Sequence, residues 1–204
     1  REQMELLRDL RRAIEDQELE LYFQPKIHAP SGQITGAEAL IRWNHPTLGL
    51  LGPLHFIDVA EERGYIVQIG NWVIREACRQ IAEWHGKGLP LMTVGVNLSA
   101  LQFRHQDLVG LLQDALAEYQ LPGSCLDVEV TESVIMDDLE STVQTIRAIQ
   151  AMGIRMSIDD FGTGYSSLAY LKRIKADKLK IDRSFVRDIP GDQDDTAITR
   201  AIIN

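Results

Sequence analysis

The second half of the sequence alternates short apolar runs with amphipathic segments, and this alternation limits the folds the chain can adopt. Strands are expected at residues 92–98, 125–130, 154–159 and 178–181, and helices near 105–119, 138–152 and 166–172 and from about 195 onward. Strands and helices that alternate at this spacing predict a parallel sheet with helices outside it. The sequence therefore predicts an α/β fold.

The first part of the chain follows a different pattern. Residues 4–16 have the apolar spacing of a helix, and residues 19–27 and 33–43 alternate as two strands on either side of a turn at Ser31. We expect these two strands to form an antiparallel hairpin. Helices are expected at 56–63, closed by Gly64, and at 69–86. The chain then contains six expected strands.

Length and composition limit the domain organisation. The 204 residues, of which 45% are hydrophobic, suffice for one core. We therefore expect a connector helix at 1–16 and one domain at 17–204 that is incomplete at its C-terminus. Cys78 and Cys125 are expected to be buried thiols, and the five histidines to lie on the surface or in loops without forming a zinc site.

The charge and the chain ends indicate which partners and which compartment to expect. The net charge of -9 argues against a polynucleotide partner. No apolar run is long enough to span a membrane, and the N-terminus lacks a signal-peptide core. These two observations favour the cytoplasm. Because the chain begins with Arg, we also expect it to be a piece of a longer protein, either free in the cytoplasm or membrane-anchored.

The inward-facing residues of the predicted strands are the strongest functional signal. In a parallel barrel, one face of each strand is apolar and contacts the helices, and the other points inward and builds the active site at its carboxyl end. This alternation places one polar side chain inward on each of several strands. They are Glu38, Asn97, Glu129, Asp159 and Lys180, with Asp160 next to Asp159.

These inward residues offer oxygen ligands and one compensating lysine, a set that suits Mg²⁺ or Mn²⁺. Taken alone, Asp159 and Asp160 before a glycine turn fit a solvent-exposed strand end as well as they fit a metal site. A single inward Glu or Asn is also commonly a buried polar group whose hydrogen bonds are all made within the protein. Several buried carboxylates without a cation, however, would each cost on the order of several kcal/mol. The combination therefore predicts a metal site.

The segment GAEALIRW at 36–43 and six further segments resemble the EAL family of cyclic di-GMP phosphodiesterases. The other matching segments are YFQP at 22–25, AEE at 60–62, NLS at 97–99, EVTES at 129–133, DDFGTGYSS at 159–167 and KIDRSF at 180–185. The resemblance extends over essentially the whole chain from Leu10 onward. The motifs are specific only in combination, because Glu-Ala-Leu alone is a common tripeptide.

The resemblance implies a (β/α)8 TIM-like barrel with an antiparallel first strand, which hydrolyses cyclic di-GMP to linear pGpG with two Mg²⁺ or Mn²⁺ ions. The implied metal ligands are Glu38, Asn97, Glu129, Asp159 and Asp160. The implied substrate contacts are Gln24, Leu40 and Arg42. The implied catalytic residues are Glu38, Asp159, Lys180, which would hold the attacking water, and Glu132, which would anchor the loop after Asp160.

The resemblance also implies partners and shows where this chain departs from the family. A homodimer is expected through the loop after Asp160, and upstream sensor or cyclase-like domains are expected in the parent protein. An eight-stranded barrel typically needs about 250 residues, so the barrel is expected to be truncated after its sixth strand. The family's later Glu-Gly-Val-Glu motif, with its proposed general base, is absent. Lys26 and the Leu54-His55 pair also depart from the family and are expected to leave binding intact.

Two other functions remain as alternatives. The first is a non-hydrolysing cyclic di-GMP receptor, in which the metal ligands have usually degenerated. The second is a different metal-dependent barrel enzyme, such as an enolase-type proton abstractor, which would not explain the Glu-Ala-Leu and Asp-Asp-Phe-Gly-Thr-Gly segments together. Retention of the expected ligands in this sequence favours hydrolysis.

Overall fold

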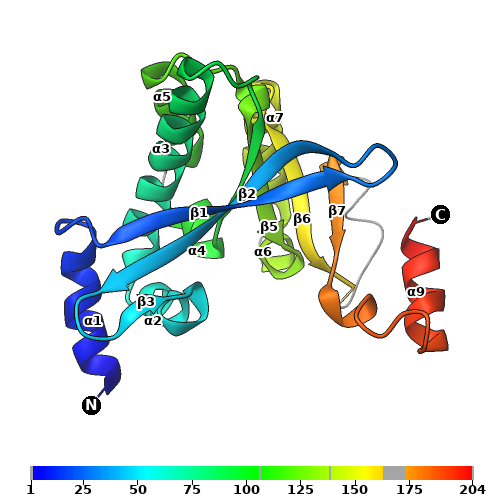
Figure 1. Cartoon of the computed structure of the whole chain (residues 1–204), viewed down its shortest axis with the longest axis horizontal. Coiled ribbons are helices and arrows are strands. Elements are labelled where there is room, and N and C mark those ends of the chain that lie inside the picture. Colours follow the sequence, from blue (N-terminus) through cyan, green and yellow to red (C-terminus); the bar gives the residue numbers. More distant parts are fainter. Residues whose placement is uncertain (1, 106, 138, 163–172, 204) are drawn as a thin grey trace.

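A single mixed sheet forms the centre of the molecule, as shown by a computed structural model that describes residues 2–105, 107–137, 139–162 and 173–203 (Figure 1). The strands of these residues are β1 Leu19–His28, β2 Gln33–His45, β3 Gly49–Leu51, β4 Thr93–Asn97, β5 Leu126–Thr131, β6 Arg155–Phe161 and β7 Lys178–Ile181. Their order in the sheet is β1-β2-β4-β5-β6-β7, and β3 pairs with β2.

The helices lie mainly along one face of this sheet and at one of its ends. They are α1 Glu2–Ala13, α2 Ile57–Glu62, α3 Tyr65–Gly86, α4 Ala100–His105, α5 Leu108–Glu118, α6 Glu132–Asp137, α7 Leu139–Ala151 and α9 Gln193–Ile203. Short 3-10 turns occur at η1 Pro53–His55, η2 Gly123–Cys125 and η3 Arg183–Phe185. Helices α3 and α5 stand to one side of β4, while α2 and α4 lie near one end of the strands (Figure 1).

Strand pairing confirms the predicted mixture of antiparallel and parallel connections. The first two strands, β1 and β2, form an antiparallel hairpin, and β2, β4, β5, β6 and β7 then follow in parallel. Parallel neighbours need a crossover, and a helix supplies it between β4 and β5 and between β5 and β6. The α/β class with antiparallel first strands is therefore confirmed. Within the described residues, β1 and β7 stand at the two ends of the strand order.

The helix-covered face of the sheet is apolar, as the alternation along each strand requires. Val94, Val96 and Val128 have no exposed surface, and α5 and α7 contribute equally buried residues such as Leu112 and Ile146. These residues belong to one continuous hydrophobic cluster. Because successive strand residues point to opposite faces, the other face of the same strands remains available for polar groups.

Several short elements differ from the sequence prediction. The structure contains a third strand, β3, and the short helices α4 and α6, none of which was expected. Helix α3 begins at Tyr65, four residues earlier than predicted, because Gly64 takes a left-handed conformation with φ of 76° and the chain re-enters a helix at once. The helix expected at 166–172 lies outside the described residues.

Helix α1 packs against the rest of the molecule. Leu10 and Ala13 are fully buried in the common core. His45 is buried as well, against the expectation of a surface or loop position, because its Nε2 lies 3.5 Å from the Asp9 carboxylate and its ring packs on Trp43. The division into a connector at 1–16 and a domain at 17–204 stays a prediction. None of the described helices combines the length and apolar character needed to cross a membrane.

Candidate active site

Three carboxylates from three neighbouring regions of the sheet meet on its polar face. They belong to Glu38 on β2, Glu129 on β5 and Asp159 on β6, and one oxygen of each lies within 4.8 Å of the others. Glu129 is fully buried, whereas the side chains of Glu38 and Asp159 are 17% and 20% exposed. The alternation rule thus predicted correctly which face these residues occupy.

The ammonium group of Lys180 on β7 lies among these carboxylates. Its Nζ donates hydrogen bonds to Glu38 at 3.1 Å, to Glu129 at 2.5 Å and to Asp159 at 2.6 Å. Burial favours the neutral amine, but the hydrogen bonds to Asp159 and Glu129 and the charge of Glu38 outweigh it and raise the pKa of Lys180 above its ordinary value. Lys180 is therefore an ammonium ion at neutral pH. It occupies the position between the three carboxylates, where their negative charges favour a cation.

Two further residues orient the carboxylates. Asn97, at the end of β4, donates from Nδ2 to Oε1 of Glu38 at 2.9 Å. Lys26 on β1 contacts the second oxygen of Glu129, so that this buried carboxylate lies between two ammonium groups. Gly95 leaves room for this arrangement, because a side chain at that position would collide with Glu129 and Lys26.

A second charged layer lies next to this cluster, around Asp127, which is fully buried. Its carboxylate accepts a hydrogen bond from Ser157 Oγ at 2.6 Å and one from Lys178 Nζ at 2.7 Å. Lys26 Nζ lies 3.9 Å away and joins the two layers. The sequence prediction assigned no role to Asp127, and it treated Lys26 only as a departure from the family that leaves binding intact.

Asp160 ends β6 in an unusual conformation. Its φ of 52° lies in the left-handed region, which is uncommon for residues other than glycine and which concentrates at functional sites. The pairing of β6 with β7 shifts register here, between Ile158 and Phe161. Burial, together with the nearby charges of Asp159 and Asp182, raises the pKa of the Asp160 carboxyl above its usual value. Asp160 lies outside the group of three carboxylates and lines the adjoining cleft.

The expected substrate contacts lie around the acidic cluster. Gln24 on β1 stands opposite Glu38 in the hairpin register, and both line a cavity of about 460 Å³. Arg42 lies four residues after Glu38 on the same face of β2, with its guanidinium 5.3 Å from the centre of the Tyr22 ring. Leu40 lines a separate cleft. Of the three, Gln24 shares a cavity with Glu38, Leu40 lines the cleft that Glu129 also lines, and Arg42 contacts the Tyr22 ring; their roles stay predictions.

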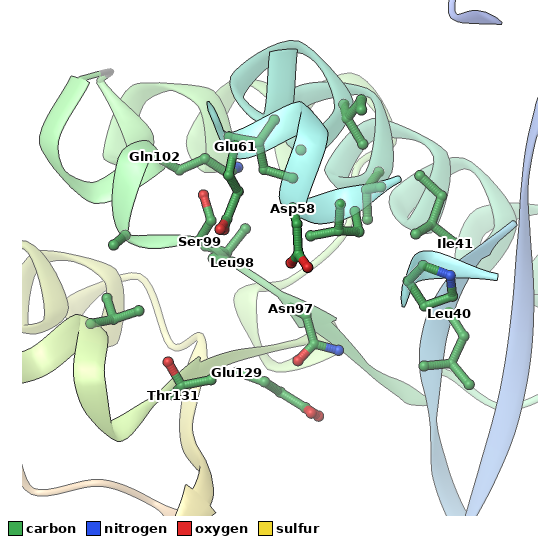
Figure 2. A pocket seen from close by; sticks show the side chains of 18 of the residues that line it. Leu40, Ile41, Asp58, Glu61, Asn97, Leu98, Ser99, Gln102, Glu129 and Thr131 are labelled. Carbon is green, nitrogen blue, oxygen red and sulfur yellow. The ribbon is translucent and has the colours of Figure 1, made fainter. Parts of the chain in front are cut away.

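This cleft, of about 590 Å³, runs from the acidic cluster toward helices α2 and α4 (Figure 2). Glu129 and Asn97 line its lower end, and Asp58 and Glu61 extend into it from α2. The sequence prediction assigned no role to Asp58, and it used Glu61 only as part of a family segment. The spacing of these two acids on α2, three residues apart, places them on the same side of that helix.

Glu132, which was predicted to anchor the loop after Asp160, is buried at the end of β5. It is the first residue of α6, directly after β5, and it is only 5% exposed. The loop that it was predicted to anchor continues beyond Gly162 into residues outside those described. The predicted anchoring role and the predicted dimer contact of that loop therefore stay predictions.

The residues present fit a hard divalent cation. Mg²⁺ and Mn²⁺ prefer carboxylate and amide oxygens, and Glu38, Glu129 and Asp159 bring such oxygens within 4.8 Å of one another. The same three carboxylates hold the ammonium of Lys180, which shows that they favour a positive charge at that place.

Comparisons with known proteins show which family the chain resembles. The model of the family described as "EAL domain" matches residues 7–204. The chain is 50% identical over 202 residues to the bifunctional diguanylate cyclase/cyclic di-GMP phosphodiesterase MucR of Pseudomonas aeruginosa, covering 99% of this chain and 30% of MucR. It is 43% identical over 202 residues to the cyclic di-GMP phosphodiesterase NbdA of the same organism, covering 99% of this chain and 26% of NbdA.

Among solved structures, the chain resembles the PaMucR phosphodiesterase in complex with c-di-GMP, with a TM-score of 0.93 and 50% identity over 98% of this chain and 81% of that chain. The chain spans less than a third of the length of the two curated relatives. The family match, in contrast, covers nearly every residue of the chain. The chain therefore belongs to the EAL domain family.

Proposed function

We propose that this domain hydrolyses the cyclic dinucleotide cyclic di-GMP to linear pGpG, with the help of two Mg²⁺ or Mn²⁺ ions. The observation that carries the proposal is the convergence of Glu38, Glu129 and Asp159 around one cationic position. MucR and NbdA, which are named as cyclic di-GMP phosphodiesterases, support the choice of substrate.

The charge of the site explains why cations are needed. Cyclic di-GMP carries two phosphodiester charges, and the site presents several carboxylates on a chain with a net charge of -9. Glu38, Glu129 and Asp159 would hold the ions together with Asn97 and Asp160. Bound divalent ions would neutralise the phosphate and lower the pKa of a water molecule toward neutrality.

The residues of the chain itself would position the reactants. Lys180 Nζ is a charged donor within 3.1 Å of all three carboxylates, so it is placed to hold the attacking water by a hydrogen bond once the ions occupy the carboxylates. Arg42 offers a planar pair of N–H donors that suits a phosphate. Gln24 supplies an amide on the same face of the hairpin as Glu38. Glu132 would support the loop that carries Asp160.

The experiment is a product assay on the full-length protein. Cyclic di-GMP is incubated with the protein in the presence of Mg²⁺ or of a chelator, and the nucleotides are separated by chromatography. We expect pGpG with Mg²⁺, none with the chelator, and none with Asp159→Asn. Asp188→Asn is the matched control, because Asp188 is exposed and pairs only with its neighbour Arg187 among the described residues.

Two results would contradict the proposal. Tight binding of cyclic di-GMP without any product would identify a non-hydrolysing receptor. Absence of both binding and cleavage would remove cyclic di-GMP as the substrate. The homodimer through the loop after Asp160, the upstream sensor or cyclase-like domains and the cytoplasmic location stay predictions, and size-exclusion chromatography with light scattering checks the first of them.

A further inference from the structure

The three carboxylates of the acidic cluster share a bonding pattern, in which each has one oxygen on Lys180 and the other on a second donor. Lys180 Nζ bonds one oxygen each of Glu38, Glu129 and Asp159. The second donors are the Asn97 amide for Glu38 at 2.9 Å, the backbone N–H of Asp160 for Asp159 at 2.9 Å, and the Lys26 ammonium for Glu129. Each carboxylate therefore has one oxygen left for a cation that takes the place of the Lys180 ammonium.

The number of oxygens that a carboxylate offers affects the choice of cation. Mg²⁺ is small, needs nearly ideal octahedral geometry and keeps several of its water molecules, and Mn²⁺ also takes octahedral sites of oxygen ligands. Ca²⁺ is larger, collects about six to eight oxygens and readily takes both oxygens of one carboxylate. A site in which a donor occupies one oxygen of each carboxylate therefore favours the smaller ions.

Of the three second donors, Lys26 is the one outside the implied set of metal ligands. Asn97 and Asp160 belong to that set, so a change at either residue would alter a ligand as well as the hydrogen bond. Lys26 bonds Glu129, which is the most buried of the three carboxylates. A change at Lys26 would therefore free one carboxylate oxygen and leave every proposed ligand in place.

The fold holds the Lys26 ammonium against Glu129. On the other side of Nζ lies Asp127 Oδ2, at 3.9 Å, and this buried carboxylate is held in turn by Lys178 Nζ at 2.7 Å. Gly95 on β4 keeps the space open, because a side chain there would collide with both Lys26 and Glu129. Only 28% of the Lys26 side chain is exposed. The ammonium is therefore positioned by its neighbours rather than extended into solvent.

A purely structural role for Lys26 would be to balance the charge of Glu129 and Asp127, which are both fully buried. Charge balance acts alike on Mn²⁺ and Ca²⁺, because the two ions carry the same charge. Holding one oxygen of Glu129 acts differently on them, because Ca²⁺ gains more from a second oxygen. The two roles therefore differ in their effect on the ratio of the two affinities.

We propose that Lys26 is a positioning residue of the cation site, which holds one oxygen of Glu129 so that this carboxylate gives the ion only the other. Lys26 thereby makes the site select Mg²⁺ and Mn²⁺ over Ca²⁺. The inference rests on the proposed function and deepens it, because it adds a residue outside the implied ligands that decides which ion the site accepts.

The test measures the binding of Mn²⁺ and of Ca²⁺, each without nucleotide, to the full-length protein by isothermal titration calorimetry. The wild type is compared with Lys26→Met, which removes the donor, and with Lys26→Arg, which keeps the charge and the N–H groups. Lys87→Met is the matched control, because Lys87 is an exposed lysine at the end of α3 that pairs with Glu83. Binding that persists in Glu38→Gln/Asp159→Asn belongs to other sites and is subtracted.

We expect the wild type to bind Mn²⁺ more tightly than Ca²⁺. Lys26→Met should shift the ratio of the two dissociation constants toward Ca²⁺ by about tenfold, the scale on which partners of metal ligands change metal affinity. Lys26→Arg and Lys87→Met should keep the wild-type ratio. An unchanged ratio in a folded Lys26→Met protein would overturn the inference, even if both affinities rise, since that is the effect of charge alone. A wild type that binds neither ion at the cluster would instead overturn the proposed function.

A second measurement applies if Lys26→Met fails to fold. In crystals of the wild type soaked in Mn²⁺, Glu129 should bind the ion through the oxygen that bonds Lys180 in this structure, while its other oxygen keeps Lys26 Nζ. A Glu129 carboxylate with both oxygens on the ion, or a Lys26 ammonium displaced from Glu129, would overturn the inference.

Discussion

The two faces of the sheet are built from the same strands but obey different physical rules. The face covered by α3, α5 and α7 is apolar, and residues such as Leu112 and Val96 have no exposed surface there. The opposite face gathers carboxylates and lysines, of which Glu129 and Asp127 are equally buried. Burial alone therefore does not distinguish the faces. On the helix-covered face, burial removes apolar surface from water. On the opposite face, the buried groups are charged and pair with one another.

The two faces therefore contribute differently to stability and to chemistry. Apolar burial stabilises the fold in proportion to the area removed from water. Buried ion pairs contribute little to stability on balance, because desolvation offsets their attraction, but the loss of one partner is costly. We expect variants on the helix-covered face to change stability and leave the chemistry intact, and variants on the polar face to change the chemistry first.

The largest effect is expected for Glu129→Gln, which should lower both the turnover and the free energy of unfolding. The change removes a proposed metal ligand and leaves the ammonium groups of Lys26 and Lys180 without the carboxylate between them. Turnover of cyclic di-GMP should fall more than about a hundredfold, because even residues that only support metal ligands cost ten- to hundredfold. The free energy of unfolding should fall by about 2–3 kcal/mol, below the full cost of an unpaired buried charge because both lysines are partly exposed.

Urea denaturation and the product assay together measure these two quantities. Glu83→Gln is the control, since Glu83 is a partly exposed residue of α3 that pairs with Arg79 and Lys87. It should leave the free energy of unfolding essentially unchanged, as surface substitutions usually do. Full activity in Glu129→Gln would show that the buried carboxylate is structural only.

The next effect is expected on the other face, for Leu112→Ala. Leu112 on α5 has no exposed surface, so its truncation leaves a cavity in the core and should lower the free energy of unfolding by about 2–5 kcal/mol. Below its unfolding temperature the variant should keep the kcat of the wild type. A strong loss of kcat in a folded Leu112→Ala protein would contradict the expectation that variants on the helix-covered face leave the chemistry intact.

A smaller effect is expected for Lys178→Met, in the layer beside the acidic cluster of Glu38, Glu129 and Asp159. The change removes one of the partners of the buried Asp127, whose carboxylate keeps Ser157 Oγ at 2.6 Å and Lys26 at 3.9 Å. Because Lys178 is 41% exposed, we expect a loss of only about 1–2 kcal/mol in unfolding free energy. Lys178→Arg should recover most of this loss, and equal destabilisation by both variants would argue against the ion pair.

The smallest effect concerns the thiols on the apolar face. Burial raises the pKa of the Cys78 thiol from 9.0 to about 12 and raises that of Cys125 as well. At pH 8 both should react very slowly with a thiol reagent, because the thiolate is the reactive form, and both should react at once in denaturant. The folded protein holds these protons more tightly than the unfolded chain. Stability from this source is therefore complete below pH 9 and declines as the pH rises toward 12.

The sequence allowed the main features of this architecture to be predicted because they depend on regular alternation. The period of two along 125–131 was enough to place Glu129 on the polar face and Val128 on the apolar one. Lys26 could have been found in the same way, since it lies two residues after Gln24 on the same face of β1. It was missed because its partner, Glu129, lies 103 residues away, and no local pattern reports such a pairing.

The short elements could not be predicted for a different reason. Strand β3 and helix α4 have only 3 and 6 residues, too few to show a period. Asp160 breaks the alternation because its left-handed conformation and the register shift at the end of β6 change the direction of the chain. The end of the cleft near α2 depends on Asp58 and Gln102, which come from separate helices and meet only through the packing of α2, α3 and α4.

We propose that the polar face binds divalent cations at the position that the Lys180 ammonium occupies in this structure. The most direct measurement is an anomalous difference map from crystals soaked in Mn²⁺. We predict a peak bound by oxygens of Glu38, Glu129 and Asp159, with Lys180 Nζ moved away from the hydrogen-bonding positions that it occupies at 2.5–3.1 Å from these carboxylates. A map without such a peak, in which Lys180 keeps all three hydrogen bonds, would contradict the account.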